Sequence, residues 1–508
     1  MFDFGIIPPA MFLGMVLFML FGFPVAFSLG AVGIFFGLIG IATGHFQEVF
    51  LQALPYRFFG IVSNDLLLAI PFFTMMGAIL ERCGLAEDLL EGTGKLFGAV
   101  PGGIAYAVIL VGAIMGAITG TVAASVITMG MISLPVMLRY GYSEKLATGV
   151  IAASGTMAQL IPPSLVLVIL SDQLGKSVGD MYMGAVGPAM MQIGIFILFI
   201  LGVSIFRPSL VPPLPKEVRG DLDWKLIRKV LAGMLPSIVL IFLVLGTIFL
   251  GLATPTEAGA LGVVGALVLA AAHRRLTWPL MRQAMESTMS ITSMVVMILV
   301  GSTCFSLVFQ GMDGSRWIEH MLTGLPGGQT GFLLFVNFFI FFLAFFLDFF
   351  EIAFIVVPML APVAQHLGID LIWFGVLICV NMQTSFMHPP FGFALFYLRS
   401  VAPKSVKTRE IYLGSIPWVC MQLIIVGVVI FLPQSVTMWV EKPKELNLDK
   451  VKIEVPALGG GLGLPPIGGG SGGPNFDLGT PPSFGGAGAG TTPAAKPATD
   501  LSQPPVFK

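Results

Sequence analysis

Two segments deep within apolar sequence combine hydroxyl and amide side chains with a pair of adjacent prolines. The first, "ASGTMAQLIPPS" (153–164), ends in Pro162-Pro163, and the second, "NMQTSFMHPPFG" (381–392), contains Pro389-Pro390. A proline inside a helix costs about 3 kcal/mol or more, because it lacks an amide hydrogen and clashes with the preceding turn. Both segments therefore predict a broken helix. Freed carbonyls and hydroxyl oxygens there suit a hard cation such as Na+, and the N-termini of half-helices suit an anion.

Each half of the chain adds a second polar segment, "AITGT" (117–121) in the first half and "FLDFFE" (346–351) in the second. We predict that these turns and the two breaks together bind an ion and a solute. Small polar residues also let helices approach closely, so a packing role is the alternative. The predicted site residues are Thr119, Gly120, Thr121, Ser154, Gly155, Thr156, Pro162, Pro163, Asp348, Glu351, Asn381, Gln383, Thr384, Ser385, Pro389 and Pro390, with Gln159 and Ser164 beside the first break.

The carboxylates near these segments have two possible roles. Asp348 and Glu351 cost on the order of 2.5–3.5 kcal/mol each at membrane depth, so they are expected to face protein or water. They fit either ion ligands or caps of a helix N-terminus. Glu257 lies three residues after Thr254 in "TPTEAGALG", a spacing typical of a capping box, which favours a structural role. His388 is expected to be a wall residue.

Composition determines the class of protein in which these segments lie. The 508 residues are 56% hydrophobic and 10% charged, with a mean hydropathy of +0.94, which predicts an all-α polytopic membrane protein. A net charge of −1 without a basic patch argues against nucleic acid as a partner. No histidine cluster or metal-ligand spacing suggests an enzyme or a cofactor. Four dispersed cysteines, Cys83, Cys304, Cys379 and Cys420, are expected to be packing residues.

Apolar runs of about 20 residues, long enough to span a bilayer, predict the membrane helices. They lie near 6–23, 24–42, 62–80, 182–206, 230–252, 254–273, 289–310 and 413–434. Four longer or interrupted stretches, 104–137, 143–171, 329–362 and 370–398, predict two re-entrant hairpins and two discontinuous helices. The Gly/Pro-rich sequence at 441–508 is expected to be disordered.

The two halves of the chain resemble each other in order. Pro101-Gly102-Gly103 matches Pro326-Gly327-Gly328, the two proline pairs match, and "LGAVG" (29–33) matches "LGVVG" (261–265), at offsets of 225, 227 and 232 residues. Cytoplasmic loops are enriched in Lys and Arg. Arg139 and Lys145 follow the first hairpin, whereas the matching "VAQHLGID" has neither. This asymmetry predicts inverted repeats with both termini in the periplasm.

Inverted repeats with matching interruptions are typical of transporters that bind their solute near the bilayer midplane. We therefore predict the following division of the chain: N-terminal scaffold helices at 1–61, a first transport region at 62–181, scaffold helices with a basic loop at 182–288, a second transport region at 289–398, a last membrane helix at 399–440 and the tail at 441–508.

Four motifs carry a family resemblance: "TPTEAGALG", "AASGTMAQLIPPS", "FLDFFEIAFIVVPMLAP" and "NMQTSFMHPPFGFALFYLR". With them, residues 5–436 resemble the large membrane subunit of the tripartite ATP-independent periplasmic (TRAP) transporters, the DctM-like permeases, in their mannitol/chloroaromatic-type branch. The family's hairpin tips and unwound loops fall on Thr119–Thr121, Ser154–Thr156, Asp348 and Asn381–Ser385. His388 departs from the family pattern, in which Thr is more usual before Pro-Pro.

The resemblance implies a function and a set of partners. It implies a multi-pass protein of the bacterial inner membrane that works by an elevator mechanism and takes up a small carboxylate, such as a 2-oxo acid, with Na+ as the coupling ion. The implied partners are a small DctQ-like membrane subunit and a periplasmic DctP-like binding protein. A stand-alone sodium/dicarboxylate-type symporter of related architecture is the alternative, and a membrane enzyme or scaffold is a third class with little support.

Overall fold

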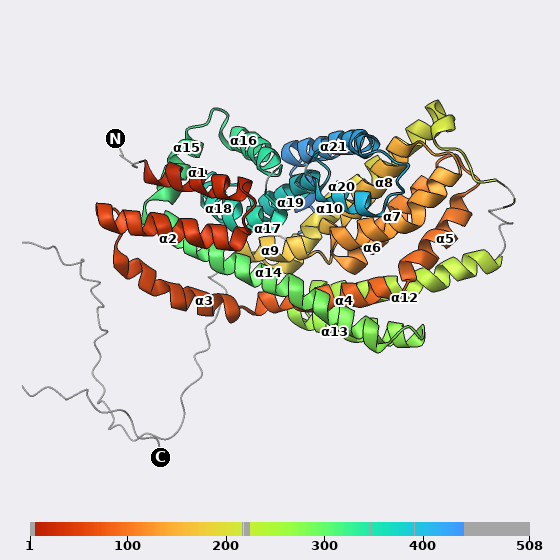
Figure 1. The fold of residues 1–508 in the computed structure, drawn as a ribbon, viewed down its shortest axis with the longest axis horizontal. Helices are drawn as coiled ribbons and strands as arrows, with labels where there is room; N and C mark the ends of the chain where they lie inside the picture. The colour runs from red at the N-terminus through yellow and green to blue at the C-terminus, as the bar shows by residue number, and fades with distance from the viewer. Residues whose placement is uncertain (1–5, 216, 218–223, 346, 391, 441–508) are drawn as a thin grey trace, which may run out of the picture. The chain divides into compact units, whose positions relative to one another are not determined.

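The computed structural model describes residues 6–215, 217, 224–345, 347–390 and 392–440 of the chain. Every regular element in these ranges is a helix, which confirms the all-α class (Figure 1). The predicted disordered tail lies outside the described residues. Seven helices are long and apolar enough to cross a membrane, or up to nine if each of two bent helix pairs is counted as one span. The prediction of a multi-pass membrane protein is therefore confirmed.

Outside the four interrupted stretches, helices match most of the expected spans with shifted ends, and further helices at 54–62, 85–97 and 314–323 were not expected. The chain begins with α1 (Ile7–Leu20), α2 (Val25–Thr43), α3 (Leu54–Val62), α4 (Ala69–Arg82) and α5 (Leu85–Phe97). The middle holds α10 (Val178–Phe206), α12 (Trp224–Phe249), α13 (Pro255–Ala272), α14 (Trp278–Gly311) and α15 (Gly314–Thr323), and the chain closes with α21 (Thr408–Phe431) and α22 (Gln434–Thr437).

The expected span near 62–80 is matched by a helical segment that starts with a 3₁₀ turn (Asp65–Leu68) and follows an unpredicted bend. The chain bends by 46° between 48–62 and 65–82, and α4 begins only at Ala69. Asn64 explains the bend, because its side-chain oxygen accepts a hydrogen bond from the Leu66 amide at 3.0 Å and so starts a new helical turn. The Asn64 amide group also donates to Asp172 at 2.7 Å, which connects the bend to the end of a distant helix.

The two predicted hairpins are present. The first consists of α6 (Gly103–Thr119) and α7 (Val122–Arg139). The second consists of α16 (Gly328–Leu343) and a return arm of α17 (Phe349–Glu351), a π-helical turn (Ile352–Val356) and α18 (Val357–His366). Each hairpin follows a Pro-Gly-Gly turn in which a glycine, Gly102 or Gly327, takes the left-handed conformation with φ of 81° or 96°.

Both discontinuous helices are present as well. In the first half, α8 (Glu144–Thr156) passes through a short 3₁₀ turn (Met157–Gln159) and an irregular segment to α9 (Leu165–Gln173). In the second half, α19 (Leu371–Met382) passes through a 3₁₀ turn (Gln383–Phe386) to α20 (Phe393–Val401). The peptide bonds within both proline pairs are cis. Hairpin and broken helix thus recur in the same order in both halves, as the sequence repeat predicts.

Two smaller expectations have opposite outcomes. The capping box at the start of α13 is confirmed, because the Thr254 hydroxyl accepts from the Glu257 amide at 3.3 Å while Glu257 accepts from the Thr254 amide at 2.8 Å.

The four cysteines are not all packing residues. Cys83, Cys304 and Cys379 are buried, but Cys420 is exposed on α21. An apolar segment alone does not show which face of a membrane helix points to the lipid.

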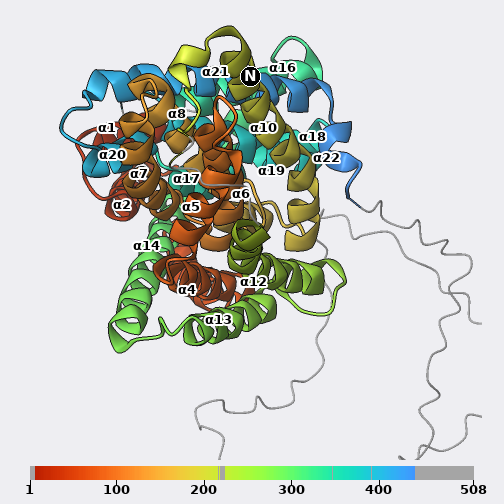
Figure 2. The ribbon, with the colours of Figure 1, turned by 90° about the vertical axis from the view of Figure 1, so that its right-hand side faces the viewer.

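One side of the helical unit combines helices from a predicted scaffold region, α12 and α13, with α4 and most of α14, which belong to the predicted transport regions. Figures 1 and 2 both show α4, α12, α13 and α14 along the lower side, with the hairpins and the broken helices above them. The division into scaffold and transport regions itself stays a prediction, because residues 1–443 form a single compact unit.

A backbone contact between α8 and α21 positions the first broken helix. A Cβ atom added at Gly414 would lie 2.2 Å from the Lys145 carbonyl oxygen, and one added at Gly149 would lie 2.2 Å from the Gly414 oxygen. The buried Trp418, one turn further along α21, has its ring against Phe196 with the centroids 4.9 Å apart. The two helices therefore approach as closely as their glycines permit.

We predict that Gly414→Ala destabilises the protein by about 1–3 kcal/mol, because the added methyl group meets backbone that has no room to shift. The matched control is Gly427→Ala on the same helix, where an added Cβ meets no atom within 4 Å. Thermal unfolding in detergent measures both variants. Equal midpoints for the two would show that α8 and α21 do not pack this closely.

Candidate functional site

The tip of the first hairpin contains Thr119, Gly120 and Thr121. Gly120 takes the left-handed conformation with a φ of 59°, which turns the chain back between α6 and α7. The Thr119 hydroxyl is already bonded, since it donates to the Met115 carbonyl at 2.9 Å and lies 2.9 Å from the Ser125 hydroxyl. Thr121 is the N-cap residue of α7, but its side chain does not cap the helix. The first amides of α7 are therefore available to another acceptor.

The first break is held by its own hydroxyl groups. Ser164 donates to the Gln159 carbonyl, and Thr156 donates to the Ala153 carbonyl at 2.8 Å. Two buried groups at the break remain without a hydrogen-bond partner in the described part of the chain, namely the Ser154 hydroxyl and both polar atoms of the Gln159 side chain. Buried polar atoms normally have partners. These atoms are therefore suited to bind an ion, a water molecule or a solute.

The tip of the second hairpin carries the carboxylates. Asp348 caps α17 by accepting from the Phe349 amide at 2.6 Å, and Glu351 accepts from the Asp348 amide at 2.9 Å. Together they form a capping box. The structure thus shows the capping alternative for both residues, and a role as ion ligands stays a prediction. Glu351 is buried, whereas Asp348 borders a cavity.

The second break is also braced by side chains. Thr384 donates to the Asn381 carbonyl at 2.6 Å, and Ser385 donates to the Met382 carbonyl at 2.5 Å. Asn381 donates to the Asn337 carbonyl on α16 at 2.8 Å, and its own side-chain oxygen has no partner among the described residues. Because a hydroxyl that donates keeps its lone pairs, Thr384 and Ser385 are still able to accept or to bind a cation.

One contact at the second break is missing from the sequence prediction. The Gln192 amide, buried in the middle of α10, donates to the Gln383 side-chain oxygen. The sequence contains one signal for it, a lone glutamine in an otherwise apolar run. Intramembrane polar residues of this kind usually face the protein interior.

His388 lies in an aromatic wall at the second hairpin. Its ring stacks on Phe345, with centroids 4.4 Å apart and planes 10° apart, and meets Phe341 edge-on at 4.2 Å. The side chain is 2% exposed. The ring therefore packs among aromatic side chains, and a role for His388 as a wall residue of the binding site stays a prediction.

The two breaks meet. Cys379, on α19, donates from its sulfur to the Gln159 carbonyl at 3.4 Å, and the Thr156 hydroxyl lies 3.9 Å from the Met387 sulfur. Residues more than 200 positions apart in sequence are thus in direct contact. The repeat brings its two interrupted helices to one place.

A cavity of about 380 Å³ lies where both breaks and both hairpin tips converge. Of the predicted site residues, Gly120, Thr121 and Asp348 line it, together with Gln159, and the other predicted residues lie outside its lining. Most of the wall is apolar and was not predicted. The additional lining residues are Val122, Ala123, Leu165, Val166, Ile291, Met294, Phe349, Phe350, Phe386, Phe393 and Tyr397.

First-turn residues of four helices contribute to this wall. They belong to α7 (Val122), α9 (Leu165), α17 (Phe349) and α20 (Phe393). A side chain caps only α17 among these four, through Asp348. Helix N-termini present free amides and the positive end of the helix dipole, so the cavity is suited to an anion.

Comparison with known proteins identifies relatives. Residues 12–435 match the family model described as "Tripartite ATP-independent periplasmic transporter, DctM component". The chain is 30% identical to the C4-dicarboxylate TRAP transporter large permease protein DctM of Pseudomonas aeruginosa, over 75% of this chain and 88% of that protein. It is 26% identical to the 2,3-diketo-L-gulonate TRAP transporter large permease protein YiaN of Escherichia coli, over 82% of this chain and 94% of that protein.

A solved structure shares the fold. The YdaH transporter of Alcanivorax borkumensis superposes with a TM-score of 0.54 at 15% identity, over 76% of this chain and 88% of that one. At this identity the similarity concerns the fold alone.

We predict that Ala123→Cys reacts with a small polar thiol reagent about tenfold or more faster than Ala153→Cys, because thiol reactivity follows exposure. Ala123 lines the cavity, whereas Ala153 is fully buried in α8. Both variants carry Cys420→Ala, which removes the exposed native thiol. Mass spectrometry of labelled protein gives the rates, and similar rates would mean that polar reagents do not reach this cavity.

Proposed function

The chain belongs to the DctM family of TRAP transporter components, and from this premise we propose that it is the membrane permease for sodium-driven uptake of a small organic carboxylate. It is a multi-pass protein of the bacterial inner membrane, as its relatives are. Transport, and not an enzymatic reaction, is the activity named for those relatives.

The convergence of four helix N-termini on one cavity is the observation that carries this proposal. A charge near a helix end is stabilised by about 0.3–1 kcal/mol when exposed and up to about 2 kcal/mol in partly buried geometries. Three of the four ends, those of α7, α9 and α20, have no side-chain cap. Their amides supply donors for a carboxylate that enters the cavity.

Asp348 gives a physical reason for coupling to a cation. Its carboxylate lines the same cavity, and like-charge repulsion there makes the binding of an anion less favourable. Oxygen atoms of Ser154, Gln159 and Asn381 lie buried at the breaks without a partner among the described residues. Na+ bound by such oxygens offsets the charge of Asp348 and so raises the affinity of the cavity for the anion. By linkage, the bound anion raises the affinity for Na+ by the same factor.

The names of two relatives support a carboxylate as the substrate. A C4-dicarboxylate is named for the Pseudomonas protein and 2,3-diketo-L-gulonate for the Escherichia protein, and both are carboxylates. The second has a keto group beside its carboxylate. We therefore propose a small carboxylate for this chain, with a 2-oxo acid as the narrower possibility.

An elevator motion fits the composition of the cavity wall. Its polar residues, Thr121, Gln159, Asp348 and Tyr397, all lie on the hairpins and broken helices. α14 contributes only Ile291 and Met294. Because the polar groups all lie on the hairpins and broken helices, the site can move as a whole with these elements. We propose that a small membrane subunit and a periplasmic binding protein complete the transporter, as the tripartite family description implies.

We predict that vesicles containing the permease, its small subunit and its binding protein accumulate a small carboxylate only under an inward sodium gradient. Vesicles with equal sodium on both sides are the control. Uptake that is indifferent to sodium would reject the coupling. Sodium-driven uptake without any binding protein would favour the stand-alone symporter.

We further predict that Thr121→Ala and Thr384→Ala raise the sodium concentration needed for half-maximal uptake, because each removes a hydroxyl oxygen at a tip or a break. Thr121→Ser and Thr384→Ser keep the oxygen and are the matched controls. A sodium titration of uptake measures all four variants. An unchanged titration in both alanine variants would remove these hydroxyls from the ion sites and leave the carboxylate proposal standing.

A further inference from the structure

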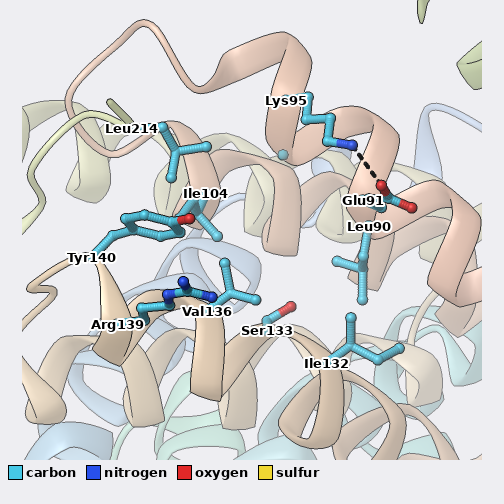
Figure 3. Close-up of a pocket in the computed structure, with 11 residues that line it drawn as sticks. Leu90, Glu91, Lys95, Ile104, Ile132, Ser133, Val136, Arg139, Tyr140 and Leu214 are labelled. Atoms are coloured by element: carbon cyan, nitrogen blue, oxygen red, sulfur yellow. Dashed lines mark hydrogen bonds and ion pairs between the residues drawn. The ribbon is translucent and has the colours of Figure 1, made fainter. Parts of the chain in front are cut away.

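A second cavity, of about 230 Å³, lies apart from the central one, between α5 and the second arm of the first hairpin (Figure 3). Apolar side chains form most of its wall, with Leu90 from α5, Ile132 and Val136 from α7, Ile104 from α6 and Leu214 from the segment between α10 and α12. None of these residues lines the central cavity. The function proposed above assigns no role to this crevice.

Helical spacing keeps the crevice open. Leu90 and Gly94 lie one turn apart on α5, and Ile132 and Val136 lie one turn apart on α7, so each helix presents a continuous strip to the other. Gly94 leaves a gap in the strip of α5. A Cβ atom added at Gly94 meets no other atom within 4 Å. A side chain added at Gly94 would therefore start in open space.

The charged groups at the crevice are not balanced. Lys95 pairs with Glu91 on α5, with the nitrogen 2.5 Å from the carboxylate oxygen. Arg139, at the last position of α7, is exposed, lies 6.0 Å from the Tyr140 ring and has no carboxylate partner among the described residues. Figure 3 shows Arg139 and Tyr140 at one end of the crevice and Ile132 and Leu90 at the other. Arg139, which has no carboxylate partner in the described part of the chain, thus lies at the end of an apolar slot.

The position of the crevice along the membrane helix indicates the kind of ligand. α7 is long and apolar enough to span a membrane, and Arg139 ends it. At a rise of about 1.5 Å per residue, Ile132 lies about 10 Å deeper than Arg139 along the helix. A cation at headgroup depth above an apolar slot at hydrocarbon depth matches one abundant molecule, a membrane phospholipid.

We propose that this crevice binds a phospholipid, with its phosphate at Arg139 and one acyl chain between α5 and α7. The lipid fills the gap at Gly94 and links α5 to the first hairpin. The site is independent of the proposed transport function, because it depends only on the crevice and on the end of a membrane helix.

Photo-crosslinking tests the site. The full chain is reconstituted in phosphatidylethanolamine vesicles that contain phosphatidylglycerol with a diazirine midway along one acyl chain, and adducts are mapped by mass spectrometry. We expect adducts on Leu90, Ile132 and Val136, and several-fold fewer in Gly94→Leu, which fills the slot. Gly94→Ala, which adds only a methyl group, is the matched control and is expected to form adducts at the wild-type level.

The charge is tested in the same assay. Arg139→Gln is expected to lower the adduct yield several-fold, and Arg139→Lys is expected to retain most of it. Millimolar inorganic phosphate should not compete, because the acyl chain contributes to binding. Thermal unfolding of each variant checks that it is folded.

Three outcomes would overturn the proposal. The first is a wild-type protein with no adducts in the crevice, which would indicate that protein covers it. The second is equal labelling of Gly94→Leu and Gly94→Ala. The third is a crevice yield no higher than that on Val239 and Phe242, which are exposed apolar residues of α12 and report ordinary lipid contact.

Discussion

The backbone polar groups freed by two broken helices must be satisfied inside the protein, because lipid offers them no hydrogen bonds. The structure meets this constraint locally. The hydroxyls of Ser164, Thr384 and Ser385 donate hydrogen bonds to nearby backbone carbonyls. The side-chain amide of Asn381 donates to the Asn337 carbonyl on α16. This constraint explains why the hairpins pack around the breaks, since an unwound segment is stable only when other protein surrounds it. The glycine contact between α8 and α21 is part of that enclosure.

The same constraint explains how much of the fold was predictable. Proline pairs, Pro-Gly-Gly turns and capping residues act over a few positions, so their consequences are readable from the sequence. The bend at Asn64 escaped prediction because it depends on one side chain within an apolar run. The exposed position of Cys420 escaped prediction because hydropathy does not distinguish the buried face of a membrane helix from its exposed face.

The candidate site was only partly predictable for a related reason. Polar residues at the tips and breaks were identifiable by type, and Gly120, Thr121 and Asp348 do line the cavity. The aromatic residues of the wall, such as Phe386 and Tyr397, resemble the rest of an apolar chain. Their place in the wall depends on tertiary packing between helices far apart in sequence. Most of the predicted polar residues instead brace the backbone just outside the cavity.

The two hairpin tips, although related by the repeat, differ in charge. The first contains Thr119 and Thr121, and the second contains Asp348 and Glu351, which form a capping box. A duplicated fold usually suggests two equivalent half-sites. Here the duplication has diverged, so carboxyl groups lie at the second tip and hydroxyl groups at the first. The backbone symmetry alone therefore does not specify the arrangement of polar groups around the cavity.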